Sequence, residues 1–231
     1  MIGIIGAMEV EIEKIVERLD NKKSEIISGI EFVCGNYFGS SIVAAVSGIG
    51  KVNAAIAAEA MIIRFSPEFI INTGVAGSLS DKLNIGDIAV SADVAEHDLE
   101  PLGDPKGFIP GLDKIKIAAD NNLCQKFCEI LSKLDINYEK GTIVSGDQFI
   151  NSNIIKKKLS GEFDAICCEM EGASIGHVCA VNNIPFCILR AISDNADDNS
   201  HINYEEFTKL AADNSVKVLE LFFRGLKSKS I

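Results

Sequence analysis

The sequence predicts a single-domain α/β fold in which a mixed, mostly parallel central sheet is flanked by helices. Short apolar segments typical of buried strands alternate along the chain with segments of helical periodicity, which favours a sheet covered on both faces. With 231 residues, 47% of them hydrophobic, the chain is long enough to bury one large core. Because neither an internal repeat nor a linker divides it, we expect one domain over residues 1–231.

The first half of the chain predicts strands separated by two helices. The apolar segment 2–7 is typical of a buried strand, and 8–19 carries an apolar stripe with helical spacing. Residues 25–48 combine strand composition with glycine and asparagine breaks, which indicates strands joined by hairpins. The alanine-rich segment 51–65 predicts a helix, and 68–74 predicts a strand that ends in a glycine-rich turn, GVAGSL.

The second half of the chain continues the alternation around one long loop. Residues 85–94 predict a strand, and 96–111, which hold three of the five prolines, predict an irregular loop of a kind that is commonly functional. The remaining segments are assigned from the same apolar patterns. They are helices at about 113–134, 152–160, 171–182 and 203–225, and strands at 141–146, 164–168 and 186–193.

Composition and charge exclude several classes of protein. The formal net charge is −11 and the lysine run 156–158 is typical of a solvated helix face, so nucleic-acid binding is not expected. The apolar runs are shorter than the roughly 20 residues of a membrane span, and the acidic N-terminus lacks the basic region of a signal peptide. Seven cysteines without a CxxC pair argue against a disulfide framework or a zinc site, and the sequence predicts a reduced, cytoplasmic protein.

Familiar nucleotide-binding and catalytic motifs are incomplete. GIGKVN (48–53) begins like a dinucleotide fingerprint, but Asn53 stands in place of its third glycine. The GK pair at 50–51 lacks the upstream glycine and the following Ser or Thr of a P-loop, and neither a GxSxG nor an HExxH motif occurs. His177 lies on an apolar helix face and is predicted to be a core histidine. We therefore expect neither a cofactor nor a metal.

Three carboxylates remain, each near the end of a predicted apolar strand. Glu11 and Glu171 could serve only the N-termini of their helices, and Asp194 could cap a turn. A buried, unpaired carboxylate is costly, however, so Glu171 in the segment CCEMEGAS needs a polar partner from the protein or from a ligand. Because ligands bind beyond the carboxyl ends of such strands, the three residues together predict a carboxylate-lined pocket.

Six segments, in order along the chain, resemble the 5′-methylthioadenosine/S-adenosylhomocysteine nucleosidases of the purine nucleoside phosphorylase-like superfamily. They are IGIIGAMEVE, VSGIGKVNAA, INTGVAGSL, VSGDQFI, EMEGASIGHV and RAISDNAD. The resemblance implies a nucleoside phosphorylase-like fold and hydrolysis of the N-glycosidic bond of methylthioadenosine, adenosylhomocysteine and also 5′-deoxyadenosine. Adenine and a thioribose product would be released, as in methionine salvage. The resemblance also implies a homodimer whose ligands are adenine nucleosides.

The same resemblance implies a role for each matching residue. Glu11 corresponds to the general base that activates water, and Asp194 to the general acid that protonates adenine N7. Glu171 corresponds to the carboxylate that binds the ribose hydroxyls, whereas Glu169 is expected to be structural. The other implied substrate contacts are Met170 against the ribose, Phe149 and Ile150 at the adenine, Met8, Ile49 and Phe207 around the 5′-alkylthio group, Gly77, and Pro110 from the partner subunit.

Two positions depart from the family pattern. Val75 stands where some relatives carry a serine, and Leu102 lies near an expected aromatic in the 96–111 loop. The sequence therefore leaves open a 6-amino-6-deoxyfutalosine nucleosidase and a catalytically silent nucleoside-binding module on the same fold. A phosphorylase is disfavoured, because Asn72 and Val75 stand where related phosphorylases carry a phosphate-binding arginine and serine. The apolar loop residues that we expect a dimer to bury are Leu102, Phe108, Ile109 and Pro110.

Overall fold

The computed structural model describes residues 1–134, 136–198 and 200–227, and the elements follow the predicted alternation closely. The strands are β1 (Ile2–Gly6), β2 (Asp20–Ile27), β3 (Ile30–Tyr37), β4 (Ser40–Val46), β5 (Phe69–Ser78), β6 (Ile88–Glu96), β7 (Ile117–Ala118), β8 (Tyr138–Ser145), β9 (Ala165–Glu169) and β10 (Phe186–Asp194). The helices are α1 (Glu9–Glu17), α2 (Lys51–Phe65), α3 (Asn121–Leu131), α4 (Asn153–Phe163), α5 (Gly172–Asn182) and α6 (Ser200–Lys227).

All of these strands belong to one mixed sheet, as predicted. Nine of them follow the order β10-β6-β8-β9-β5-β1-β4-β3-β2, and β7 pairs with β6. Parallel pairing joins β1 to β4 and β5, β10 to β5, and β8 to its neighbours β6 and β9, whereas the β2–β3–β4 hairpins are antiparallel. Because β10 also pairs with β5, the strands β10, β6, β8, β9 and β5 close into a ring.

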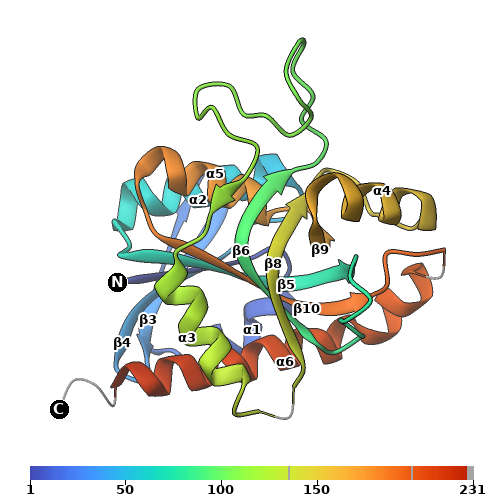
Figure 1. Ribbon diagram of the computed structural model, residues 1–231. Coiled ribbons are helices and arrows are strands. Elements are labelled where there is room, and N and C mark those ends of the chain that lie inside the picture. Colours follow the sequence, from blue (N-terminus) through green and yellow to red (C-terminus); the bar gives the residue numbers. More distant parts are fainter. Residues whose placement is uncertain (135, 199, 228–231) are drawn as a thin grey trace.

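Helices cover both faces of the sheet (Figure 1). Helices α2 and α5 pack together on one face, and α1 and α3 both pack against α6 on the other. Strand β1 is therefore buried along its whole length, as is β10, which explains why their sequences are nearly continuous apolar runs. No helix in the described part of the chain has the length and apolar character needed to cross a membrane.

The glycine-rich segment after the predicted strand 68–74 is a continuation of β5 rather than the predicted turn. Strand β5 continues to Ser78, in register with β10 and, at Gly77 and Ser78, with β9. The glycines are explained by the close approach of buried side chains. A Cβ on Gly74 would lie 2.6 Å from Glu11 Oε1, and a Cβ on Gly77 would lie 2.8 Å from Asp194 Oδ1.

The predicted helix at about 113–134 is shorter in the structure. Ile117 and Ala118 form β7 against β6, and helix α3 begins only at Asn121. The carboxylate of Asp120 accepts a hydrogen bond from the backbone N–H of Leu123 at 2.8 Å and so caps the helix. The strand β2 also begins earlier than predicted, at Asp20 rather than at residue 25.

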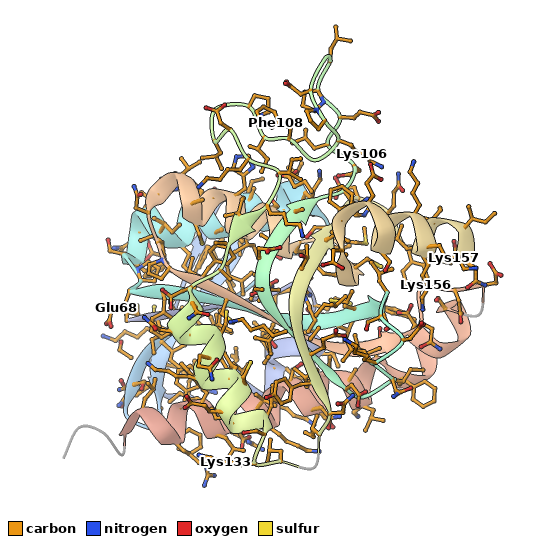
Figure 2. The ribbon with its side chains drawn as sticks, viewed as in Figure 1. Glu68, Lys106, Phe108, Lys133, Lys156 and Lys157 are labelled. Atoms are coloured by element: carbon orange, nitrogen blue, oxygen red, sulfur yellow. The ribbon has the colours of Figure 1, made fainter. Side chains whose placement is uncertain are left out.

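The loop that follows β6 projects from the body of the protein, as Figure 1 shows. Figure 2 labels Lys106 and Phe108 on this loop. Leu102 and Pro110 are exposed, but Ile109 is buried within its own chain, because the backbone turns back through an Ile109–Lys114 bridge. We expected a partner subunit to bury the four apolar residues of this loop, and this expectation is wrong for Ile109.

Candidate active site

A cavity of about 410 Å³ lies where the carboxyl ends of β1, β5, β8, β9 and β10 meet. This volume is within the usual range of small-molecule sites, about 300–1,000 Å³. The expected site residues that line the cavity are Met8, Glu11, Ile49, Gly77, Phe149, Ile150, Met170, Glu171 and Asp194. Two expected residues lie outside this lining: Phe207 is half-buried on α6, and Pro110 is exposed on the projecting loop.

Glu11 lies in the first turn of α1 and is 1% exposed. Its Oε2 accepts hydrogen bonds from the backbone N–H groups of Ala7 at 2.7 Å and Met8 at 3.0 Å, and its Oε1 accepts one from Val75 at 3.1 Å. Burial raises the pKa of Glu11, and the opposing effects of Arg190 and the three N–H donors do not cancel this rise. Glu11 therefore both caps its helix and presents a proton-accepting group to the cavity.

Arg190 is the central cation of the site, and it is buried in the middle of β10. Its Nη2 donates to Glu169 Oε2 and, at 2.6 Å, to Asn72 Oδ1. The Glu169 carboxylate also accepts the backbone N–H groups of Glu171 and Gly172, at 3.0 and 2.8 Å, so it caps α5 as well. Glu169 thus has the structural role that the sequence predicted.

Glu171 stands at the N-cap position of α5 and is 4% exposed. Its Oε1 accepts the backbone N–H of Gly50 at 2.9 Å, and its Oε2 lies 3.5 Å from Arg190 Nη2. Burial raises the pKa of Glu171 to about 7; Arg190 opposes the rise, and the neighbouring Glu169 adds to it. The protein thus supplies Glu171 with two partners, one of them distant, and leaves acceptor capacity on the cavity side.

Asp194 ends β10 and is 2% exposed. Its Oδ1 accepts the backbone N–H of Ala196 at 2.8 Å and its Oδ2 accepts the hydroxyl of Ser193 at 2.9 Å, so the turn-capping interpretation is correct in geometry. Burial raises the pKa of Asp194 against the effects of the Ala196 N–H and the Ser200 and Ser193 hydroxyls. The residue is therefore a carboxyl group that holds its proton to higher pH than an exposed aspartate.

The rest of the lining is mostly apolar, and one of its members was missed by sequence reasoning. Tyr204 on α6 packs edge-on against Phe149, with ring centroids 5.4 Å apart, and its hydroxyl donates to Met8 Sδ at 3.3 Å. Tyr204 lies three residues before Phe207, so an aromatic on the same helical face was the available signal. Ile49, which is 52% exposed, stands at the edge of the cavity.

Arg190 was also missed, although it begins the segment RAISDNAD. A lone arginine inside the apolar strand FCILRAIS was the signal, because a buried guanidinium requires carboxylate partners nearby. The prediction for His177 was wrong: this side chain is half-buried rather than in the core, and its Nδ1 lies 2.9 Å from Glu96 Oε1. Glu96 is the charged partner that the apolar helix face of His177 did not reveal.

The cavity brings together carboxyl groups that can exchange protons with a bound molecule. Glu11 and Asp194 are carboxyl groups on different elements of one cavity, and burial raises the pKa of each toward neutrality. Groups with this property are suited to act as general base and general acid near neutral pH. A third carboxyl, Glu171, provides a fixed acceptor for hydroxyl groups beside them.

Comparison with known proteins identifies the family. A family model of the phosphorylase superfamily matches residues 1–224. The 5′-methylthioadenosine/S-adenosylhomocysteine nucleosidase of Neisseria meningitidis, solved with methylthio-immucillin-A, is 35% identical with a TM-score of 0.93, over 97% of this chain and 98% of that one. A mutant of the Helicobacter pylori nucleosidase, with 5′-methylthioadenosine in its active site, is 37% identical to this chain. Its TM-score is 0.91, over 95% of this chain and 96% of that one.

A similar structure from Helicobacter pylori is named for a second enzyme activity. The native structure of futalosine hydrolase from strain 26695 is 37% identical to this chain, with a TM-score of 0.90 and coverage of 95% of each chain. The fold, the gathering of carboxyl groups and these similarities all agree. The chain therefore belongs to the phosphorylase superfamily and, within it, to the 5′-methylthioadenosine/S-adenosylhomocysteine nucleosidases, a family of enzymes that hydrolyse N-glycosidic bonds.

Proposed function

We propose that this enzyme hydrolyses the N-glycosidic bond of 5′-methylthioadenosine and S-adenosylhomocysteine and thereby releases adenine. The observation that carries the proposal is the gathering of Glu11, Glu171 and Asp194 in one cavity whose remaining lining is mostly apolar. Such a cavity suits a nucleoside, which combines a flat aromatic base with a sugar that carries hydroxyl groups. The 5′-methylthioadenosine in the active site of the Helicobacter pylori mutant supports this substrate class.

Asp194 and Glu11 divide the proton transfers. Adenine is a poor leaving group as an anion, so Asp194 donates its proton to adenine N7 while the bond to the sugar breaks. Glu11 accepts a proton from the water that attacks the oxocarbenium-like sugar from the other side, as in inverting glycosidases. The raised pKa values of both groups support these assignments, because a general acid must hold its proton and a general base must be basic enough to take one.

Glu171 binds the ribose in its ionised form. Oε1 is held by the Gly50 N–H at 2.9 Å, and the carboxylate can accept the 2′- and 3′-hydroxyls of the sugar as further donors. Met170 packs against the ribose, Phe149 stacks on adenine and the backbone of Ile150 reads its edge. Met8 and Ile49 surround the 5′-alkylthio group, with Tyr204 fixing Met8 through its hydroxyl.

Water is favoured over phosphate as the nucleophile by the charges around Arg190. The guanidinium donates a hydrogen bond to Asn72. A cation therefore lies beside the position at which related phosphorylases carry a phosphate-binding arginine. Its charge is already matched by Glu169, and Glu11 and Glu171 are close enough to raise its pKa further against the effect of burial. Three carboxyl groups surround one guanidinium, so they would repel a phosphate dianion. A neutral water would not be repelled in this way.

A second candidate substrate is 6-amino-6-deoxyfutalosine. The observation that favours it is the similarity, at 37% identity, to futalosine hydrolase of Helicobacter pylori. The two substrates share the base and the ribose and differ at the 5′ substituent, which lies near Met8 and Ile49 in the proposed binding mode. The proposed proton transfers by Glu11 and Asp194 are the same for both.

We also propose that the enzyme is a homodimer formed through α2 and α5. A groove of about 940 Å³ runs between these helices and is lined in part by Ile56, Ile63 and Val181, which are 42%, 72% and 59% exposed. Contiguous exposed apolar groups of this kind are typical of protein interfaces. In such a dimer, Pro110 and the fully exposed Leu102 on the projecting loop would reach toward the 5′ pocket of the partner subunit.

The central test of the proposed function is a pair of isosteric substitutions. We expect Glu11→Gln and Asp194→Asn each to lose at least about 10²-fold in turnover, since each removes a positioned acid or base, while binding of methylthio-immucillin-A persists. Adenine release is followed by ultraviolet absorbance with methylthioadenosine, adenosylhomocysteine and aminodeoxyfutalosine.

Glu9→Gln on the same helix and Asp198→Asn on the loop after β10 are the matched controls, because both side chains are exposed. Both controls should keep wild-type turnover. Near-wild-type rates in either Glu11→Gln or Asp194→Asn would overturn that residue's assignment. Tight nucleoside binding without adenine release by the wild type would instead identify a silent binding module.

The pKa of Glu171 predicts how stability depends on pH. Because its pKa is about 7 when folded and 4.5 ordinarily, the folded state binds more protons than the unfolded state between these values. The free energy of unfolding should therefore fall as pH rises through this window, and the loss is complete above it. In Glu171→Gln this loss is absent, so the variant should gain about 2–3 kcal/mol over wild type between pH 5 and pH 8.

Urea unfolding at the two pH values measures this gain. Glu162→Gln, at an exposed position on α4, is the control and should follow the wild type at both pH values. An equal difference between Glu171→Gln and wild type at pH 5 and pH 8 would show that Glu171 is not the group that titrates.

Sedimentation velocity tests the dimer. We expect the wild type to sediment as a dimer at micromolar concentration and Ile56→Glu to sediment as a monomer, because a buried charge would replace apolar contact in the groove. Ile154→Glu on α4, at a position that is 81% exposed, should remain dimeric. An active wild-type monomer, with an unchanged Michaelis constant on dilution, would rule out a pocket shared between subunits.

A further inference from the structure

Lys51 is the first residue of α2, and it belongs to the GIGKVN segment whose nucleotide motifs are incomplete. Its side chain is only 16% exposed, and its ammonium lies between two carboxylates. The Nζ–O distances are 2.9 Å to Glu96 Oε2 and 2.6 Å to Asp98 Oδ1. Burial lowers the pKa of Lys51, but the hydrogen bonds and charges of Asp98 and Glu96 outweigh this effect and raise it. Lys51 is therefore a charged lysine fixed inside the protein.

Three hydrogen bonds join Lys51 to two other segments in a closed ring. The backbone N–H of Lys51 donates to Asp147 Oδ1 at 2.7 Å, and the backbone N–H of Asp147 donates to Asp98 Oδ2 at 2.8 Å. The ring closes through Asp98 Oδ1, which accepts from Lys51 Nζ. The start of α2, the start of the projecting loop and the segment after β8 are thus tied at one point.

The residue just before this ring holds the ribose-binding carboxylate. Gly50 donates its backbone N–H to Glu171 Oε1 at 2.9 Å, at a φ of +99° that favours glycine. A Cβ on Gly50 would also lie 3.0 Å from Asp147 Oδ1. Successive N–H groups of Gly50 and Lys51 are therefore divided between Glu171 and Asp147.

Helix α2 has no capping side chain of its own. Gly50 occupies the N-cap position without a side-chain hydrogen bond, and the first turn contains no acidic residue. The carboxylates of Glu171 and Asp147 take this role from other parts of the chain, where the positive end of the helix dipole favours them. The position of the Gly50 N–H relative to Glu171 thus depends on how firmly the helix start is anchored.

We propose that Lys51 is a positioning residue for the nucleosidase reaction: by anchoring the start of α2 to Asp98 and Glu96, it fixes the Gly50 N–H against Glu171 and so orients the ribose-binding carboxylate. This inference rests on the proposed function, since it assigns Lys51 to the ribose half of that site. The ammonium itself acts through Gly50 and Glu171, and its ion pairs within the described residues are with Glu96 and Asp98.

Charged groups around Glu171 shift its pKa, as does the Gly50 N–H. The charged groups that act on the Glu171 carboxylate from neighbouring elements are Arg190 on β10, Glu169 on β9 and Glu11 on α1, and Glu171 in turn raises the pKa of Tyr204 on α6. Of these only Arg190 favours the charged form. Withdrawal of the Gly50 N–H would therefore weaken the ionised form of Glu171 as well as its orientation.

A double-mutant cycle between Lys51 and Glu171 tests the proposal. We expect Lys51→Met to lower kcat/KM for methylthioadenosine by about 10- to 100-fold, because a displaced substrate-binding group has effects of this size. In the Glu171→Gln background the same substitution should change kcat/KM by less than about threefold, because the carboxylate through which Lys51 acts is gone.

Three further measurements separate positioning from general stability. Discrimination against the 2′-deoxy substrate should be smaller in Lys51→Met than in wild type, and Lys51→Arg should restore part of it. Lys116→Met removes another half-buried lysine that pairs across elements, with Thr142 at 2.8 Å, and should leave kcat/KM unchanged. If Lys51→Met does not fold, Asp98→Asn opens the same ring and should show the same dependence on Glu171.

Two outcomes would overturn the proposal, and they differ from each other. Equal losses from Lys51→Met with and without Glu171, in an otherwise active enzyme, would reduce Lys51 to a structural residue while the proposed function stands. Absence of adenine release by the wild type would remove the proposed function and this inference together.

Discussion

The pairing of the buried Arg190 guanidinium with Glu169 is the interaction on which the rest of the site depends. The guanidinium projects from the middle of β10, directly beside Gly74 of β5 in the strand register, and it reaches Glu169 and Asn72. A side chain on Gly74 would collide with the guanidinium, so the bare glycine makes the crossing possible. Removing one partner of such a buried pair typically costs about 3–5 kcal/mol, which ties the geometry of β5, β9 and β10 together.

The same charge affects the pKa values of the surrounding carboxyl groups. One guanidinium faces Glu169, Glu171 and Glu11, and Glu169 is its closest ion-pair partner. The other two carboxyl groups are buried without a full counter-charge, and burial therefore raises their pKa values despite Arg190. A raised pKa suits a carboxyl group that exchanges a proton with a substrate, which is the role that we propose for Glu11.

The three central carboxylates make structural contacts and also line the cavity in which we propose that they act. Glu11 caps α1, Glu171 meets the start of α2 and Asp194 closes a turn, yet all three line the cavity. A structural contact of these carboxylates is therefore compatible with the proposed role in the cavity. A helix start or a tight turn supplies N–H donors that hold a carboxylate in one orientation, and a reacting group needs such an orientation.

Much of the fold and of the site could be predicted from the sequence, because both depend on local patterns. Helix α2 has the predicted bounds, and nine of the expected site residues, from Met8 to Asp194, line one cavity. The segment GVAGSL was misread because glycine marks either a turn or a close approach, and only the positions of Arg190 and Asp194 decide which.

Other features depended on contacts between distant parts of the chain. Tyr204 reaches the cavity only through the packing of α6, and Ile109 is buried only because its loop folds back on itself. The pairing of His177 with Glu96 joins residues 81 positions apart, so no helical pattern could reveal it. All of the site roles stay predictions, and Phe207 and Pro110 do not line the cavity of their own chain.

The proposed hydrolysis requires water as the nucleophile. The decisive measurement is the mass of the sugar released from methylthioadenosine by the wild-type enzyme, together with the rate of adenine release as phosphate is added. The account predicts free 5-methylthioribose and a rate that phosphate does not change. Methylthioribose 1-phosphate as the product, with a rate that rises with phosphate, would contradict it.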